Sequence, residues 1–486
     1  FVWVLNINIV VAQEYKRANN WVTGFAPVVK FMFEPTFQID TFAITYFTKC
    51  SSVISDTLGA YQFYCTGYYM MDKQGDSMQN GNNINCPKGK ILADYYGGSS
   101  LFDQTSIILP KKGNTYYIFS TGMSDSVANN YLSHIKTEFD VLNYSIVDMD
   151  SNSGKGKVTI KNKILLENQH YTNCALTAVK HGNGKDWWLV KADCENNRYQ
   201  TFVVKEDTIL GPYYQNIASS GDFCTWLSQL YFSEDGTKFA SSIYGEIIGG
   251  VYSRNRVDIY DFDRCSGEIS YRTHYIVPYD ESSFPNKDVK SGICFSPNGK
   301  LLYMSNMYTI YQIDLEDTNK YNATFIAGPD TSIAQFPWYS TMACGPNGNL
   351  YIGTFSGSYY MSYIDKPNIK GIGCDFTPHG LWQPYTGLLS PPNMPNYGLG
   401  PVPVGVNCWP VQTEDIIDER EELLVYPNPA NDKFYIKNKT GKKKELYSSV
   451  GQLIISTTKD EINVSSFAKG LYYLKCDGIS CKVIIE

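Results

Sequence analysis

Charge is scarce in this sequence, and basic charge is scarcer than acidic charge. Charged residues make up 18% of the 486 residues, and 41 Lys and Arg face 48 Asp and Glu, which gives a formal net charge of −7 at pH 7. A nucleic-acid partner needs a basic face that displaces counterions from phosphates, so the composition excludes that class of partner. Beyond the first dozen residues, no apolar run approaches the ~20 residues that a membrane-spanning helix requires, which predicts a soluble mature chain.

Patterns of common catalytic sites are also missing. The sequence contains no H-E-x-x-H, no G-x-S-x-G, no P-loop and no G-x-G-x-x-G after a strand. Ser466 and Lys469 fit the short S-x-x-K pattern, which we interpret as coincidence. Residues 148–154, DMDSNSG, alternate oxygen-bearing side chains as a calcium loop does, but Gly comes at the seventh position instead of the sixth, and Thr159 stands where a bidentate Glu belongs. The sequence therefore predicts no catalytic residue, no metal site and no cofactor.

Histidines and cysteines do not gather at metal-site spacings either. No i, i+4 or H-x-H spacing occurs among the five histidines, which are His134, His170, His181, His274 and His379. Thirteen scattered cysteines predict folding in an oxidising compartment, where disulfides persist. Cys476 and Cys481 flank the four residues DGIS in a predicted hairpin, and we predict a disulfide between them. Residues 1–12 are apolar and end in Val10-Val11-Ala12, so we interpret them as the remnant of a secretory signal peptide, with a buried first strand as the alternative.

Glycine and aromatic residues are plentiful, and glycine recurs in a repeated turn. Aromatic residues reach 15%, with 39 Tyr and 39 Gly, a bias typical of an all-β chain. In SPNG, residues 296–299, Pro presets φ for the second turn position and Gly ends the turn without a Cβ clash. The same design, flanked by short apolar runs, occurs at intervals of 49 to 71 residues around six glycines: Gly59, Gly113, Gly184, Gly236, Gly299 and Gly348.

This repeat predicts the architecture of most of the chain. Three or four short antiparallel strands per ~50 residues are typical of a propeller blade. We therefore predict a β-propeller over residues 20–410 with about seven blades; six or eight blades, and a pair of unrelated sandwiches, are the alternatives. The count of seven assumes that residues 20–50 and 372–405 combine into one blade.

Another kind of sequence begins after the propeller. Residues 411–422, VQTEDIIDEREE, hold six acids and predict an extended, solvated linker. Pro427 and Pro429 then keep the chain extended, and alternating apolar residues follow. Residues 423–486 predict a small immunoglobulin-like β-sandwich of about seven short strands. They hold ten Lys against six Asp and Glu, which leaves a net charge of about −11 on the rest of the chain.

Both parts resemble a known family. The order of YFSEDGTKFA, GICFSPNGKLLYMSN and GPNGNLYIG resembles that in secreted bacterial WD-repeat-like β-propeller proteins with a type IX secretion system sorting domain. The terminal part resembles the type A C-terminal sorting domain, with these matching residues: Tyr426, Pro427, Asn428 and Pro429 for its opening YPNP, Gly451 for its hairpin, Gly470 and Tyr472 for its G-x-Y motif, and Lys482 in its last apolar strand. Glu486 departs from the family, whose members commonly end in Lys or Arg.

The resemblance implies export of the chain and removal of its terminal domain. It implies recognition by the type IX translocon and a product that is secreted or attached to the outer-membrane surface. It also implies cleavage near residues 411–424 by a surface sortase-like peptidase and attachment of the new C-terminus to lipopolysaccharide.

For the propeller we predict a binding or adhesion module for an unidentified glycan or protein. Exposed aromatic side chains would serve such a role, and core packing is the alternative for most of them. The tryptophans considered are Trp187, Trp188, Trp226, Trp338, Trp382 and Trp409. The rival functions are a secreted propeller enzyme, such as a metal-dependent hydrolase, and a structural surface-layer component.

Overall fold

The computed structural model divides the chain into two compact units, Phe1–Gln412 and Thr413–Glu486, which we call the body and the tail. The signal-peptide remnant predicted at residues 1–12 and the linker predicted at 411–422 lie outside the described residues. Within the described part of the chain, no helix is long and apolar enough to cross a membrane. The structure describes residues 14–486 apart from 24–27, 34–36, 44–51, 97–99, 101, 134–137, 172–173, 194, 217–222, 225–228, 243, 249–250, 278–290, 307, 329–337, 355–357, 388–389, 404–407, 409–422, 438–440, 450 and 477–478.

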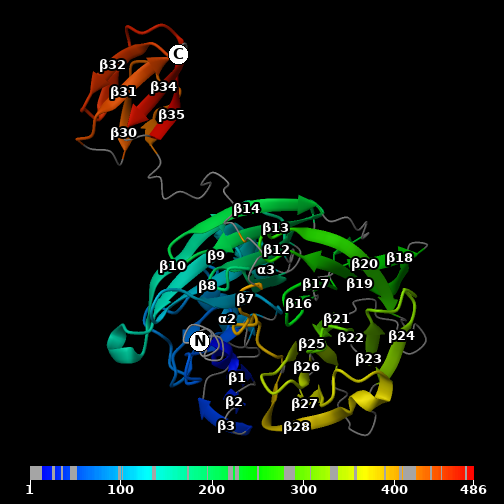
Figure 1. The fold of residues 1–486 in the computed structure, drawn as a ribbon. Helices are drawn as coiled ribbons and strands as arrows, with labels where there is room; N and C mark the ends of the chain where they lie inside the picture. The colour runs from blue at the N-terminus through cyan, green and yellow to red at the C-terminus, as the bar shows by residue number, and fades with distance from the viewer. Residues whose placement is uncertain are drawn as a thin grey trace, which may run out of the picture. The chain divides into compact units, whose positions relative to one another are not determined.

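The body consists of antiparallel sheets, seven of them among the described residues (Figure 1). The first three sheets contain β1 (Asn20–Thr23), β2 (Val28–Met32) and β3 (Gln38–Ala43); β4 (Ser52–Ser55), β5 (Tyr61–Cys65) and β6 (Met70–Met71); and β7 (Ser106–Pro110), β8 (Thr115–Gly122), β9 (Val141–Asp148) and β10 (Lys157–Leu166). The fourth contains β11 (Leu176–Lys180), β12 (Trp187–Asp193), β13 (Arg198–Val204) and β14 (Ile209–Asn216). The fifth contains β15 (Phe223–Cys224), β16 (Leu230–Phe232), β17 (Lys238–Ser241), β18 (Tyr244–Ile248), β19 (Val251–Phe262) and β20 (Ile269–Val277).

The last two sheets have four strands each. They contain β21 (Ser291–Phe295), β22 (Leu301–Asn306), β23 (Thr309–Asp314) and β24 (Ala323–Ala327), then β25 (Tyr339–Cys344), β26 (Leu350–Thr354), β27 (Ser358–Ile364) and β28 (Phe376–Gly387). Short helices precede or interrupt the strands: η1 (Lys16–Ala18), α2 (Gly89–Tyr96), α3 (Asp125–Leu132), η2 (Asn152–Gly154) and η3 (Gly371–Cys374).

The sheets follow one another around a ring, as in a β-propeller. Neighbouring sheets contact through their innermost strands, in the order β1, β4, β7, β11, β16, β21 and β25. The ring closes because the first and last sheets share a buried aromatic cluster. In it the Trp21 ring lies 5.0 Å from the Phe33 ring and 5.3 Å from the Tyr351 ring, both in edge-to-face contact. The predicted all-β propeller is confirmed.

The predicted joint blade of residues 20–50 and 372–405 is not formed. β28 pairs with β27 and completes the last sheet, whereas β1, β2 and β3 form a sheet of their own. A strand that pairs with its neighbour along the chain closes only a short loop, which costs less entropy than pairing the two ends of a body of this length. Each end of the body therefore keeps its own sheet, and side-chain packing closes the ring.

The six turn glycines lie in the first hairpin of a sheet, with φ angles from 62° to 88°. At Gly299 the turn is held by a hydrogen bond from Gly299 N to Ser296 O (2.8 Å), and Leu301 N donates to Ser296 Oγ (3.0 Å). The φ angle of 65° at Gly299 would strain a residue with a Cβ. Because each of these hairpins joins the innermost strand of its sheet to the next strand along the chain, the hairpins gather on one face of the ring, which we call the turn face.

The tail is a sandwich of two sheets, as predicted. One sheet contains β29 (Leu424–Tyr426), β30 (Lys433–Lys437) and β33 (Glu461–Asn463), and the other contains β31 (Lys444–Ser448), β32 (Leu453–Thr457), β34 (Gly470–Cys476) and β35 (Ile479–Ile485). The two sheets share a core of buried apolar side chains that includes Phe434, Leu446 and Leu474.

The disulfide among the described residues differs from the prediction. It joins Cys265, which follows β19, to Cys408, 143 residues later. The predicted bond between Cys476 and Cys481 is wrong: Cys476 lies opposite Ile479 and Cys481 opposite Leu474. The two cysteines thus occupy diagonal positions of the hairpin, which are farther apart than a disulfide ordinarily spans. Both pack toward the core of the tail.

Candidate functional site

A proline-rich segment crosses the centre of the ring, where a propeller has its channel. Residues 390–403, SPPNMPNYGLGPVP, follow the last sheet, and we call them the central segment (Figure 1). Asn393 Nδ2 donates to Ser106 O (3.0 Å) and to Leu176 O (2.8 Å), which belong to the third and fourth sheets. Tyr397 OH donates to Ile108 O (2.8 Å). The segment is therefore bonded to the backbone of the innermost strands.

Two glutamines bridge the innermost strands from sheet to sheet. Gln104, before β7, accepts from Leu230 N (2.9 Å) and donates to Leu230 O (2.8 Å), so it joins the third sheet to the fifth. Gln229, before β16, accepts from Ile293 N (3.0 Å) and Met342 N (3.1 Å) and donates to Met342 O (2.7 Å). These bonds satisfy backbone groups that have no strand partner at the ring centre.

The bridges and the central segment leave little open space inside the channel. A cavity of about 50 Å³ remains between them, lined by residues that include Gln104, Gln229 and Asn393. Such a volume admits a water molecule or two and no organic substrate. A substrate would have to bind outside the channel.

A larger hollow lies where the central segment meets the turn face. This mouth groove has a volume of about 440 Å³. It is lined by four aromatic side chains, four prolines and one acid: Tyr15, Trp21, Tyr231, Tyr397, Pro297, Pro346, Pro392, Pro395 and Glu234.

Hydrogen bonds fix the walls of the mouth groove. Tyr15 OH donates to Pro346 O, and Tyr231 OH accepts from Cys344 N (3.1 Å). Asn396 Nδ2 donates to both Glu234 O and Glu234 Oε2 (2.9 Å each). The groove is therefore formed before any ligand arrives, which lowers the entropy cost of binding.

Burial and neighbouring groups raise the pKa values of two titratable groups that line the mouth groove. Burial, with a smaller effect of Asp235, raises the pKa of Glu234 above its usual range. A hydrogen bond with the Cys294 thiol, 3.5 Å away between Sγ atoms, and burial raise the pKa of Cys344 well above that of an ordinary thiol. A thiol in this state is a poor nucleophile, and the groove has Glu234 without a second carboxylate among its described lining residues. The described lining of the groove thus holds one carboxyl and one thiol, and the charged form of each is disfavoured.

Three of the tryptophans singled out in the sequence, Trp187, Trp188 and Trp382, do not line the groove. Trp187 and Trp188 are buried, and Trp188 Nε1 donates to Arg264 O (2.9 Å), so these two pack in the body. Trp382 is 57% exposed, on β28. Trp226 and Trp409 lie outside the described residues. Within the described part of the chain, no three His, Cys, Asp or Glu side chains gather closely enough to hold a metal ion.

The sorting-signal residues of the tail converge on its last strand. Asn428 Nδ2 donates to Lys482 O (2.9 Å), and Asn428 Oδ1 accepts from Ile484 N (2.8 Å). Ala430 N donates to Ile484 O (2.8 Å), and Glu486 N donates to Ala430 O (2.9 Å). The opening motif and the closing strand, more than fifty residues apart in sequence, thus form one edge of the sandwich.

The remaining motif residues shape the hairpins of the tail. Gly451, with φ 82°, ends the β31–β32 turn, where its N donates to Ser448 O (2.9 Å). Gly470 opens β34 opposite Ile485. Tyr472 is buried, and its OH donates to Ala468 O (2.7 Å). Tyr426 is half exposed and stacks on Tyr435 with 5.7 Å between ring centroids.

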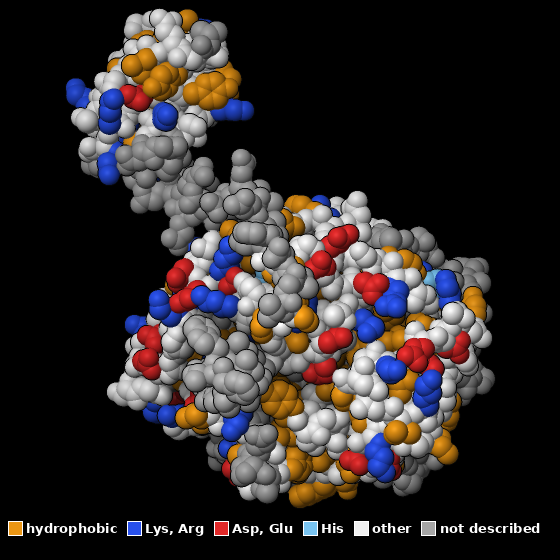
Figure 2. Space-filling view, viewed as in Figure 1, with side chains coloured by type: hydrophobic (Ala, Val, Ile, Leu, Met, Phe, Trp, Pro, Cys, Tyr) orange, Lys and Arg blue, Asp and Glu red, His pale blue; other side chains and the backbone are white. Residues whose placement is uncertain are grey.

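Apolar side chains also lie on the outer face of the tail (Figure 2). Leu471, Tyr473 and Ile484 alternate with inward-facing residues on β34 and β35 and are 37%, 37% and 43% exposed. Leu453, on β32, is 48% exposed. Exposed apolar patches of this kind mark surfaces that meet another protein.

Comparison with known proteins identifies the tail. Residues 424–486 match the family described as the secretion system C-terminal sorting domain. No curated protein matches the chain. Recognition of this domain by the type IX secretion machinery exports the protein to the cell surface or the extracellular space.

Many solved structures resemble this chain, including the following two. One is a protein of unknown function from Desulfotomaculum acetoxidans, with 11% identity and a TM-score of 0.40 over 77% of this chain and 99% of that one. The other is the periplasmic gluconolactonase of Pseudomonas aeruginosa, with 11% identity and a TM-score of 0.41 over 77% of this chain and 97% of that one. At these scores the likeness adds nothing to the fold, which is defined by the sheets themselves.

Proposed function

We propose that the exported body is a binding module that holds part of a glycan or a protein in the mouth groove. The observation that carries this proposal is the closed ring centre, because the central segment and the two glutamines leave a preformed groove in place of an open channel. The groove volume of about 440 Å³ is in the range of small-ligand sites. Its aromatic and proline walls suit an uncharged ligand about the size of a mono- or disaccharide.

A glycan array and a peptide library probed with the full chain test this proposal. Tyr15→Ala opens one wall of the groove and should weaken binding by about tenfold, the usual effect of losing an aromatic contact residue. Tyr321→Ala, which removes a tyrosine that is 62% exposed and does not line the groove, is the matched control. If Tyr15→Ala binds the ligand as tightly as the unchanged protein does, the ligand binds outside the mouth groove.

A second variant separates binding from catalysis. Glu234→Gln keeps the shape of the side chain and its acceptor for Asn396 but removes the titratable group. A binding module should retain its affinity within about threefold, since the amide keeps the shape of the side chain and burial already disfavours its charged form. If the body is instead a hydrolase that uses Glu234 as its acid, the same change should lower turnover by about a hundredfold or more.

For the tail we propose that a surface peptidase removes it within residues 411–424 and that the body then remains attached through lipopolysaccharide. The run of acids there supports this proposal, because extended, solvated backbone fits a protease cleft. Mass spectrometry of the mature protein checks it: the last residue should fall within 411–424 and carry added mass from a lipid-linked sugar. A mature protein that still ends at residue 486 would contradict it.

A further inference from the structure

A second hollow on the turn face is lined mainly by cations. It lies between the turns of the third and fourth sheets and has a volume of about 470 Å³. Its described lining contains six cations, Arg17, Lys111, Lys112, Lys180, Lys185 and Lys205, against three acids, Glu14, Asp186 and Glu206. In a chain with a net charge of −7, this excess of positive charge is local to one pocket.

Lys180 forms the floor of this basic pocket. It is only 6% exposed, and its Nζ lies 4.2 Å from the centroid of the Trp187 ring. The nearest carboxylate oxygen, Glu14 Oε2, is 3.9 Å from Nζ and is already bonded to Arg17 Nε at 2.8 Å. The Lys180 charge is thus buried without a counter-charge of its own, an unfavourable state that a bound anion would relieve.

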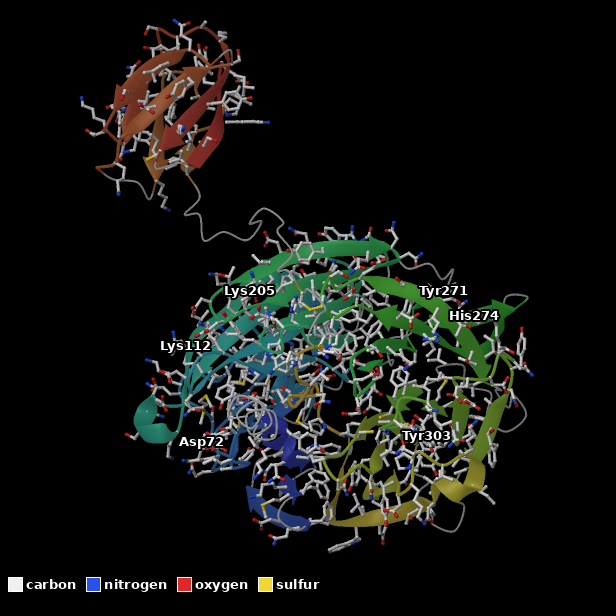
Figure 3. The ribbon with its side chains drawn as sticks, viewed as in Figure 1. Asp72, Lys112, Lys205, Tyr271, His274 and Tyr303 are labelled. Carbon is white, nitrogen blue, oxygen red and sulfur yellow. A yellow bond between two sulfur atoms is a disulfide. The ribbon has the colours of Figure 1, made fainter. Side chains whose placement is uncertain are left out.

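The rim of the pocket also has more positive than negative charge. Lys112 and Lys185 share one carboxylate, that of Glu206, with Nζ–O distances of 3.3 Å each. Lys205, in the next turn, forms no ion pair within the described part of the chain. Lys112 and Lys205 lie in turns of neighbouring sheets on the same side of the ring (Figure 3).

We propose that this basic pocket binds an anionic saccharide, with its phosphate, sulfate or carboxylate group over Lys180 and between the rim lysines. The pocket has room for a sugar ring beside the anionic group, because sites of this volume hold ligands larger than a single oxyanion. Residues 14–18 separate it from the mouth groove: Glu14 and Arg17 line the pocket, whereas Tyr15 and Ala18 line the groove. The two sites can therefore be tested independently.

Protonation of Lys180 should make the binding affinity of the pocket depend on pH. Burial lowers the pKa of Lys180 to about 8; Glu14 and Asp186 oppose that shift, whereas Arg17 and Arg264 add to it. The anion favours the protonated amine, so above pH 8, where the empty pocket loses this proton, affinity should fall by up to about tenfold per pH unit. A fall of this steepness is what deprotonation of the single amine of Lys180 produces.

The test measures binding of glucose 6-phosphate, N-acetylglucosamine 6-sulfate, glucuronate and neutral glucose to the full chain by calorimetry. At least one of the three anionic sugars should bind, more tightly at low salt than at ~0.15 M, and glucose should not. The three probes distinguish phosphate, sulfate and carboxylate as the group that is recognised. Binding of glucose as tightly as of the anionic sugars would overturn the proposal.

Variants assign the interaction to this pocket. Lys180→Met keeps the aliphatic stem of the side chain. It should weaken binding of the anionic sugar by about tenfold or more and abolish the fall in affinity above pH 8. Lys185→Ala should weaken binding of the same sugar about threefold and leave the pH dependence of the affinity unchanged. Lys300→Ala is the matched control, because Lys300 directly follows Gly299 as Lys185 follows Gly184, yet it lies outside the pocket and pairs with Glu316 at 3.1 Å.

Three results would overturn the assignment. The first is an affinity for the anionic sugar that is unchanged in Lys180→Met. The second is a loss of affinity in Lys300→Ala as large as that in Lys185→Ala. The third is an affinity that stays constant from pH 7 to about 9. If Lys180→Met does not fold, Lys205→Ala and Lys185→Ala decide the question through the same comparison with Lys300→Ala. Tyr15→Ala should leave anion binding intact, so failure of the mouth groove and failure of the basic pocket are distinguishable.

Discussion

The body and the tail are both built from antiparallel sheets, but they hold those sheets together in different ways. At the centre of the body, Gln104 and Gln229 bond to backbone groups of other sheets. The tail has an apolar core, and Asn428 acts as a polar clamp on the backbone of β35. A ring brings together strands whose backbone groups lack partners, whereas two facing sheets need only apolar side chains between them.

The surfaces of the two units differ as well. Residues before 423 carry a net charge of about −11 and include a cation-lined pocket, whereas residues 423–486 carry about +4 and expose Leu471, Tyr473 and Ile484. The tail thus presents apolar and basic surface to a partner. Recognition for export resides in the tail, whereas the ligand sites that we propose lie in the body, and the following experiments test that separation.

The largest effect is expected from removing the tail. Deletion of residues 423–486 should leave the body folded in the periplasm, with almost no protein at the cell surface, because the translocon has lost the domain that it recognises. Cell fractionation and surface labelling measure this, with the full chain as control. Normal surface display of the truncated chain would show that the body carries its own export signal.

Breaking the polar bridge at the ring centre should destabilise only the body. Gln229→Leu leaves Ile293 N, Met342 N and Met342 O buried without their partner, which should cost about 3 kcal/mol or more of unfolding free energy. Urea unfolding followed by tryptophan fluorescence reports on the body alone, because all eight tryptophans precede residue 413. An unchanged midpoint would mean that the bridge contributes no stability.

A matched substitution in the tail controls this experiment. Gln452 is exposed, and Gln452→Leu should change the unfolding free energy of either unit by less than about 0.5 kcal/mol.

A smaller effect is expected at the clamp of the tail. Asn428→Ala removes the bonds to Lys482 O and Ile484 N and should cost the tail about 1–2 kcal/mol. Hydrogen exchange of the β35 amides in the full chain should speed up, and export should decline. Asn431→Ala, at an exposed position in the same loop, should do neither. Unchanged exchange in Asn428→Ala would mean that the motif acts only as a recognition element.

An effect no larger than that of Asn428→Ala is expected at two turn glycines, and it should be equal in the two units. Gly299 in the body and Gly451 in the tail have φ angles of 65° and 82°, and a Cβ at either would meet open space or the mobile end of Lys238. Valine at either position should therefore cost only the backbone strain, about 1–2 kcal/mol. Tryptophan fluorescence measures the body variant and hydrogen exchange the tail variant. A cost confined to one unit would show that one of the turns is not formed.

Local patterns made much of the fold predictable from the sequence. The turn around Gly299 and the YPNP motif each need particular residues within a few positions, so they can be read without knowing any long-range contact. The joint blade was wrong because β28 forms a hairpin with β27, and nothing in the spacing of the turns reveals where the last hairpin ends.

The sites were less predictable because they are assembled from distant residues. Cys265 and Cys408 are 143 residues apart, so spacing could not pair them. The mouth groove depends on the run PPNMPN, which belongs to no repeat and whose path follows only from Asn393 and Tyr397. The basic pocket combines the N-terminal segment with turns from two sheets. The repeated KHGNGK and LPKKGNT turns gave the one available signal, since both carry lysines beside the turn glycine.

The Cys265–Cys408 disulfide also determines where mechanical load enters the body. In the sequence, residue 408 lies between the central segment and the tail, so a pull on the chain from its C-terminal side would reach the body at this residue. Tension at residue 408 passes across the covalent bond into the fifth sheet, so it cannot draw residues 390–403 out of the ring. A pull on the end of the body would therefore leave the central segment in place.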